Sequence, residues 1–131
     1  MKTLFTVCIS LWMYTSSFSQ NNMSSTAKDF QAFHIDQLME EVKESGRPWL
    51  AFMREQNVLT GIYHLKKGTV DGQRPHDTDE VYYIISGKSK FMAGDEESEV
   101  SPGSILFVRA EVDHRFFDIE EDLIVLVFFD Q

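Results

Sequence analysis

The chain has 131 residues, which is enough for one ordinary domain and too few for two domains with separate cores. It is 43% hydrophobic and 25% charged, as expected of a globular protein with a real core. It carries 21 acidic residues against 12 basic ones, a formal net charge of -9. Because such a surface repels phosphate backbones and anionic lipid headgroups, we expect no binding to nucleic acid or to a membrane surface.

The first 19 residues have the layout of a secretory signal peptide. Lys2 supplies a positive charge, the apolar run Leu4–Tyr14 follows, and residues 17–19 (SFS) fit the small-x-small rule for cleavage before Gln20. The apolar run is too short to cross a bilayer, which needs about 20 residues, so no membrane insertion is expected after cleavage. We therefore predict an exported protein, periplasmic or secreted. The alternatives are a retained N-terminal tail or short buried helix, or a cytoplasmic protein that starts at Met23.

Residues 20–33 are predicted to be a linker, and residues 34–131 a single domain. A short amphipathic helix that covers one end of a sheet is predicted from four apolar residues at helical spacing, which are Ile35, Leu38, Met39 and Val42. We expect Asp36 to cap its N-terminus and Gly46 to follow its last turn.

From Pro48 onward, short β-type runs alternate with turn signals. The predicted strands are Trp49–Arg54, Val58–Leu65, Glu80–Ser86, Lys88–Met92, Ile105–Val108, His114–Phe117 and Leu123–Phe129. The acidic stretch Asp95–Glu99 is predicted to be a solvated hairpin tip, and the wholly apolar Leu123–Phe129 a strand buried on both sides. Many short strands at regular spacing predict a mainly β fold, an antiparallel sandwich or barrel.

The segment Gly72–Gly87 (GQRPHDTDEVYYIISG) carries the candidate chemistry, because His76 precedes Glu80 by four residues. On one face of a regular strand these side chains would lie about 13 Å apart, at about 3.3 Å per residue. They can bind one ion only if the chain bends between them, and the turn-prone residues 77–79 (DTD) allow such a bend. The alternative is a solvated polar loop.

This segment resembles the first conserved motif of the cupin superfamily, in which a glycine precedes an HxH pair, then a glutamate, then a second glycine. Glu80 is followed by six residues and Gly87, and His76 occupies the position of the second histidine. Residues 102–108 (PGSILFV) match the opening of the second cupin motif, and His114 falls at its histidine. The resemblance covers about residues 58–129 and implies a double-stranded β-helix, the jelly-roll barrel of small single-domain cupins.

The sequence departs from the family pattern at four positions. Arg74 stands in place of the first motif histidine, and Asp118 replaces the usual asparagine. Arg109 and Glu111 stand where a proline and a glycine usually shape the loop before the last histidine. Because glutamate adopts a positive φ at a higher cost than glycine, we expect this loop to differ in shape.

The resemblance implies a metal site built from His76, Glu80 and His114, with Gln73 or a water completing the shell. Two imidazoles and one carboxylate can hold Fe(II), Mn(II), Ni(II) or Zn(II). An enzyme of this kind would be a metal-dependent dioxygenase or isomerase acting on a small molecule. One alternative is a barrel without metal, in which these residues bind each other or Arg74 and the cavity holds a small ligand without catalysis. Another is a dimeric partner-docking protein, favoured if aromatic side chains fill the cavity.

Three further side chains have a functional and a structural interpretation. Arg74 would clamp a substrate carboxylate, or else pair with a nearby acid. Tyr82 would bind the substrate or donate a proton to it, or else belong to the core. His64 would be a general base, or else a surface or strand-end histidine, and His34 is interpreted as structural. Four phenylalanines exceed the needs of one small core, and we expect some of them to line a homodimer interface: Phe116, Phe117, Phe128 and Phe129.

Overall fold

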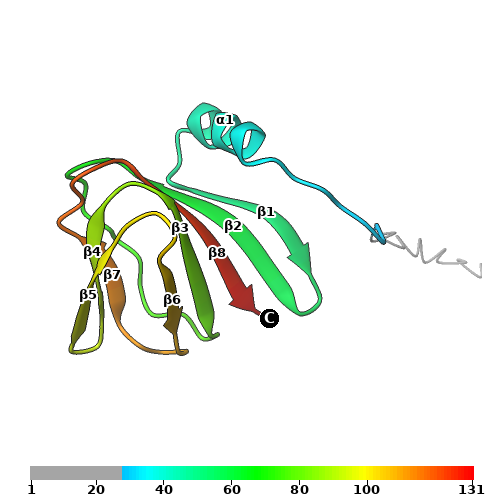
Figure 1. The fold of residues 1–131 in the computed structure, drawn as a ribbon. Helices are drawn as coiled ribbons and strands as arrows, with labels where there is room; N and C mark the ends of the chain where they lie inside the picture. Colours follow the sequence, from blue (N-terminus) through cyan, green and yellow to red (C-terminus); the bar gives the residue numbers. More distant parts are fainter. Residues whose placement is uncertain (1–27) are drawn as a thin grey trace, which may run out of the picture.

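The computed structural model describes residues 28–131, so the predicted signal peptide and the first part of the predicted linker lie outside the described residues. Helix α1 (Ile35–Ser45) precedes eight strands, which are β1 (Trp49–Glu55), β2 (Val58–Leu65), β3 (Glu80–Ser86), β4 (Ser89–Ala93), β5 (Glu96–Val100), β6 (Ile105–Val108), β7 (His114–Phe117) and β8 (Leu123–Asp130). They form two antiparallel sheets, ordered β1-β2-β8-β3-β6 and β5-β4-β7 (Figure 1). This arrangement confirms the mainly β jelly-roll barrel. Within the described chain, no helix is long and apolar enough to cross a membrane.

The two faces of the five-stranded sheet bury two separate apolar clusters, because successive strand residues point to opposite faces. The inner face packs against the three-stranded sheet around Ile84, Phe91 and Val125. On the outer face, α1 lies across β1 and β2 (Figure 1) and buries Val42 against Ile62. The barrel interior and the helix therefore use opposite sides of the same strands.

The ends of α1 are set by His34 and Gly46. The predicted cap at Asp36 is wrong, because His34 is the N-cap residue and its Nδ1 accepts a hydrogen bond from the Asp36 backbone N–H at 3.3 Å. Asp36 lies instead in the first turn, where its charge suits the positive end of the helix dipole. Gly46 follows the last turn with a φ of 65°, as predicted, and this left-handed conformation favours glycine.

Strand β8 runs through the middle of the five-stranded sheet but is not buried along its whole length. Val125 and Val127 face the core, and Leu126 packs on the opposite side in the cluster under α1. Phe128 lies beyond that cluster and is 37% exposed, so the expectation of a strand covered on both sides fails at its end. Of the four surplus phenylalanines, Phe116 belongs to the core, because it is 1% exposed.

The acidic stretch after β4 is a strand rather than a hairpin tip, which corrects the prediction for Asp95–Glu99. Strand β5 pairs with β4 from Glu96 opposite Ala93 to Val100 opposite Ser89, and only Gly94-Asp95 forms the turn. The strand lies at the edge of its sheet, where its acidic side chains are exposed. Charged residues on an edge strand hinder edge-to-edge pairing with other chains, so this composition is compatible with a strand.

Gly87 directly follows β3, at a position that no other residue fits without strain. Its φ is 94°, and a Cβ built there would lie 2.4 Å from the Asp122 carbonyl oxygen. We expect Gly87→Ala to lower the free energy of unfolding by about 2 kcal/mol or more. Gly72→Ala is the control, because a Cβ there meets no atom within 4 Å and should change stability by about 0.5 kcal/mol at most. Urea denaturation of both variants measures the difference, and equal stabilities would contradict the prediction.

Candidate metal centre and its cavity

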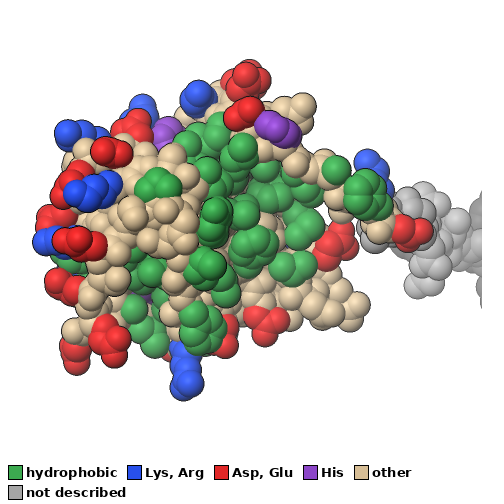
Figure 2. All heavy atoms as spheres, in the orientation of Figure 1, with side chains coloured by type: hydrophobic (Ala, Val, Ile, Leu, Met, Phe, Trp, Pro, Cys, Tyr) green, Lys and Arg blue, Asp and Glu red, His purple; other side chains and the backbone are tan. Residues whose placement is uncertain are grey.

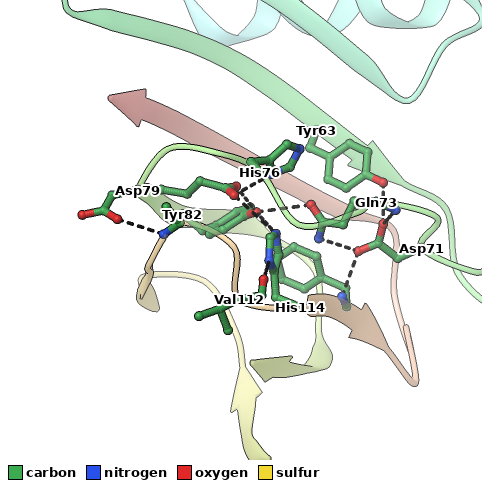
Figure 3. Close-up of polar contacts among 11 residues, drawn as sticks. Tyr63, Asp71, Gln73, His76, Asp79, Tyr82, Val112 and His114 are labelled. Atoms are coloured by element: carbon green, nitrogen blue, oxygen red, sulfur yellow. Dashed lines mark hydrogen bonds and ion pairs between the residues drawn. The ribbon is translucent and has the colours of Figure 1, made fainter. Parts of the chain in front are cut away.

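Three side chains from three separate segments of the barrel converge on one point. They are His76, Glu80 and His114 (Figure 3). They offer ligand atoms that all lie within 4.8 Å of one another. Glu80 begins β3 and His114 begins β7, and each is 1% exposed. His76 precedes β3 on a loop that bends at residues 77 and 78, which places its Nδ1 2.5 Å from Glu80 Oε1. The bend that the sequence required is therefore present.

The loop before β7 holds His76 in place through its backbone. The Glu111 N–H donates to the His76 carbonyl at 2.7 Å. The Ala110 N–H donates to Asp79 Oδ1 at 2.9 Å, a contact drawn at Asp79 in Figure 3. Glu111 has a φ of 63°, so it adopts the glycine-like conformation that was expected to be costly for a glutamate. A left-handed backbone costs about 1–2 kcal/mol for such a residue, and the hydrogen bond to His76 offsets part of that cost.

The tautomer of His114 follows from its surroundings. Its Nδ1 lies 2.7 Å from the Val112 carbonyl oxygen, which can only accept, so Nδ1 carries the proton. In the neutral ring, Nε2 then presents a lone pair, 2.9 Å from the Tyr82 hydroxyl and 3.5 Å from Glu80 Oε1. A histidine oriented in this way by a backbone carbonyl is ready to ligate a cation.

The hydroxyl of Tyr82 lies in the middle of the cluster (Figure 3). It contacts three acceptor atoms: Glu80 Oε2, His114 Nε2 at 2.9 Å and Gln73 Oε1 at 3.2 Å. Burial and the adjacent Glu80 carboxylate raise the pKa of Tyr82 far above its usual range, so the phenol stays protonated. One proton cannot satisfy three acceptors, and this shortage of donors is the electrostatic setting that a cation relieves.

Asp71 binds residues that surround this cluster, although the dipeptide Asp71-Gly72 indicates only a turn in the sequence. Its buried carboxylate accepts from the Tyr63 hydroxyl at 2.6 Å, from the Gln73 backbone N–H at 3.1 Å, from Gln73 Nε2 at 2.7 Å and from the Phe116 N–H at 2.8 Å. Because Nε2 of Gln73 is held by Asp71, its Oε1 faces Tyr82 (Figure 3). An acid placed directly before the motif glycine is the only signal in the sequence for this role.

A cavity of about 890 Å³ opens beside the cluster, with His76, Gln73 and Tyr82 in its lining. Its walls include the apolar side chains of Trp49, Leu59, Val127 and Phe129. Aromatic side chains line this space without filling it, so the condition that favoured a partner-docking protein is not met.

Arg74 and His64, the remaining candidates, occupy different positions. Arg74 is exposed and does not belong to the cavity lining, so its role as a carboxylate clamp stays a prediction. His64 lines the cavity, and its Nε2 lies 3.9 Å from Asp122 Oδ2 near the end of β2. That position matches the strand-end interpretation, and the structure brings neither residue into the cluster of His76, Glu80 and His114.

Comparison with known proteins places the chain in a family. The sequence profile described as Cupin domain matches residues 61–129, and the chain is 43% identical over 99 residues to an uncharacterised protein of Streptomyces coelicolor. That match covers 76% of this chain and 94% of the relative. The chain belongs to the cupin family.

Solved structures share the fold at low sequence identity. The DMSP lyase DddQ of Ruegeria pomeroyi matches with a TM-score of 0.55 at 18% identity, over 59% of this chain and 40% of the lyase. The salicylate 1,2-dioxygenase of Pseudaminobacter salicylatoxidans matches with a TM-score of 0.62 at 15% identity, over 73% of this chain and 32% of the dioxygenase. The chain thus spans less than half the length of either enzyme, and the likeness shows the fold alone.

The hydrogen bond between Tyr63 and Asp71 predicts a pH-dependent stability. Burial and the Asp71 carboxylate raise the pKa of Tyr63 above its usual value of about 10. Its stabilising effect is therefore complete below about pH 10 and is lost as the pH rises further. We expect Tyr63→Phe to lower the free energy of unfolding by about 1–2 kcal/mol at pH 8, and by less above about pH 10.

Denaturant titration across this pH range checks the prediction. Tyr83→Phe is the control, because Tyr83 is 41% exposed and its hydroxyl bonds to no other described residue. It should change stability at pH 8 by about 0.5 kcal/mol at most. A Tyr63→Phe deficit that stays constant or grows above about pH 10 would show that the phenol is not held protonated.

Proposed function

We propose that this chain is an exported cupin that binds one divalent metal ion, Fe, Mn, Ni or Zn, through His76, Glu80 and His114. The observation that carries the proposal is the convergence of their ligand atoms within 4.8 Å, two of the three residues being 1% exposed. Burying a carboxylate is costly unless it is paired, and a cation bound beside it offsets that cost. Two imidazoles and one carboxylate suit any of these ions. Export rests on the leader at residues 1–19.

We propose further that the cavity binds a small molecule next to this centre, as an oxidoreductase or isomerase would. A bound divalent ion supplies Lewis acidity. The protonated hydroxyl of Tyr82 lies among the ligands, where it can donate a hydrogen bond to a substrate oxygen. The lyase and the dioxygenase that share this fold are both enzymes, which supports a catalytic function.

The alternative is a cupin that binds a small ligand without metal or catalysis. This alternative predicts Arg74 as the anchor of the ligand, but Arg74 lies outside the cavity lining. It also leaves Glu80 Oε2, Gln73 Oε1 and His114 Nε2 competing for the single proton of the Tyr82 hydroxyl. The metal-binding function therefore explains more of the described geometry.

The four histidines of the chain provide a matched test of the metal site. Purified without chelator or histidine tag, the protein should retain close to one metal ion per chain by elemental analysis. His76→Ala and His114→Ala should each lower metal affinity by about a hundredfold or more, because each removes a direct ligand. His34→Ala and His64→Ala should retain the metal, because these rings lie outside the cluster.

Circular dichroism of each variant separates the loss of a ligand from the loss of the fold. Metal content that falls equally in all four variants would place the ion elsewhere. Absence of metal after loading with Fe(II), Mn(II), Ni(II) and Zn(II) would overturn the metal-binding function and leave the ligand-binding alternative.

We also propose that two copies of the chain associate through the outer face of β3, β6 and β8. Five exposed apolar side chains gather there, and we name this set the β6 face: Val81, Tyr83, Ile105, Phe107 and Phe128. They are neighbours across the strands, since Val81 is opposite both Phe107 and Phe128. Apolar side chains cover much of the sheet beside α1 (Figure 2), and β6 lies at the edge of that sheet in the described part of the chain. A second copy related by twofold symmetry can cover both the edge and the face.

Sedimentation equilibrium tests this association. Phe107 is 59% exposed, so Phe107→Glu should leave the fold intact while placing a charge in the centre of the β6 face and shifting the protein to monomer. Phe30→Glu is the control, because Phe30 is 80% exposed but lies in the segment before α1. A wild-type protein that is monomeric at about 100 μM would contradict the proposal.

A further inference from the structure

The side chains that line the cavity carry a net positive charge, whereas the protein as a whole is acidic. The chain has 21 acidic residues against 12 basic ones, yet the charged side chains that line the cavity are three cations, Lys43, Arg47 and Lys66, and one acid, Asp77. None of the three cations forms an ion pair with another residue in the range 28–131. Unpaired cations grouped at one cavity of an acidic protein are a local attraction for anions.

These three residues, which we call the cationic rim, lie away from the candidate metal centre. Lys43 is in the last turn of α1, Arg47 follows the helix and Lys66 follows β2. Strand register gives the separation between Arg47 and Tyr82 along the sheet. Tyr82 is level with Gly61, because both pair with Val127, whereas the Pro48 carbonyl next to Arg47 accepts from the His64 N–H. Three residues along β2 correspond to about 10 Å, at about 3.3 Å per residue.

The wall between the two ends of the cavity is aromatic. The Trp49 ring lies 5.7 Å from the Phe129 ring and 6.4 Å from the Tyr63 ring, centroid to centroid. Gly61 provides the space for this indole, because a Cβ at that position would lie 2.2 Å from the Trp49 ring. A ligand that extends from the cluster to the cationic rim therefore passes along an apolar surface.

A purely structural role does not account for the cationic rim. Lys43 suits the negative end of the helix dipole, which explains one cation. Arg47 and Lys66 lie outside the helix, and neither contributes an ion pair to the described fold. Lys88 and Lys90, which lie outside the cavity, pair with Glu120 and Asp118 at 3.1 Å. Other described cations, such as Lys67 and Arg74, also form no ion pair, so the rim is distinguished by the grouping of its three cations at one cavity.

We infer that the substrate of this site is an elongated amphipathic anion. Its anionic group, a carboxylate or a group of similar charge, contacts the cationic rim, its apolar body packs against Trp49 and Phe129, and its opposite end reaches His76 and Tyr82. Assignment of this ligand as a substrate rests on the metal-dependent function proposed above, whereas the ligand class follows from the cavity itself. A molecule about 10 Å long fits this arrangement.

A series of probes with one body and three charges tests the ligand class. The full chain with Trp12→Phe leaves Trp49 as its single tryptophan, placed in the cavity wall, so its fluorescence reports binding. The probes are 4-phenylbutyrate, 4-phenylbutanamide and 4-phenylbutylamine, titrated into zinc-loaded and into chelator-treated protein. We expect the anion to bind about tenfold more tightly than the amide, and the amine to bind most weakly.

Charge-matched variants locate the anion. Replacing Lys43 and Arg47 together by Gln should weaken 4-phenylbutyrate binding about five- to tenfold and leave binding of the amide unchanged. Replacing Lys88 and Lys90 by Gln removes the same net charge outside the cavity and should change neither. Lys66→Gln should weaken binding of the anion, whereas Lys67→Gln should not, because Lys67 does not line this cavity.

Any of three results would overturn the inference. The anion does not bind saturably, or the three probes bind equally well. In the third, the preference for the anion persists when Lys43 and Arg47 are replaced. Elemental analysis of the same samples keeps this failure distinct from that of the metal site. If the protein retains its metal but shows no preference among the three probes, the proposed ligand class is wrong and the metal site stands. If the protein binds no metal but prefers the anion in a way that depends on the cationic rim, the proposed ligand class is supported. Only the metal-dependent function is then wrong.

Discussion

The buried carboxylate of Glu80 is the constraint on which the arrangement of the site depends. A charge that is 1% exposed must find partners, and no single strand can supply enough of them. His76 reaches it from the preceding loop, Tyr82 from the same strand and His114 from the other sheet. Satisfying one carboxylate therefore fixes the bend before β3 and the position of β7. The first and second sequence motifs meet at this point because neither can satisfy Glu80 alone.

Asp71 is a second buried carboxylate that takes its hydrogen-bond partners from several elements. It joins Tyr63 on β2 to the backbone of Phe116 on β7, and through Gln73 it orients the acceptor that faces Tyr82. The two carboxylates are thus connected by a series of polar contacts through Gln73 and Tyr82. Side chains held in this way keep their positions when a ligand binds, which is what a site that must fix distances to a metal or substrate requires.

Patterns within short segments predicted most of the fold, because strand periodicity and turn residues act locally. The predicted and observed strands agree closely in their bounds except at Glu96–Val100, where edge position makes acidic residues acceptable. The resemblance to the two cupin motifs was enough to group His76, Glu80 and His114 as one site. Motif spacing alone did not determine how close their ligand atoms lie.

Features that depend on distant contacts were not predictable. The positive φ of Glu111 is offset by a bond to the carbonyl of His76, which lies in the other motif. Asp71 has partners at Tyr63 and Phe116, and the second is 45 residues away. Arg74 points to solvent because the loop leaves the strand path before β3, so alternation along a regular strand did not apply to it.

The net charge and the cationic rim act over different distances, so an acidic protein can still bind a small anion. At physiological ionic strength the interaction between exposed charges is screened over about 8 Å. A ligand at the cavity mouth is thus governed by Lys43, Arg47 and Lys66, together with the nearby acids Asp77 and Asp122, rather than by acids on the far side of the barrel. A phosphate backbone or a lipid surface extends over many such distances and meets the acidic surface as a whole. The charge that argues against those extended partners therefore leaves a small anionic ligand possible, and only the local arrangement of side chains decides whether it binds.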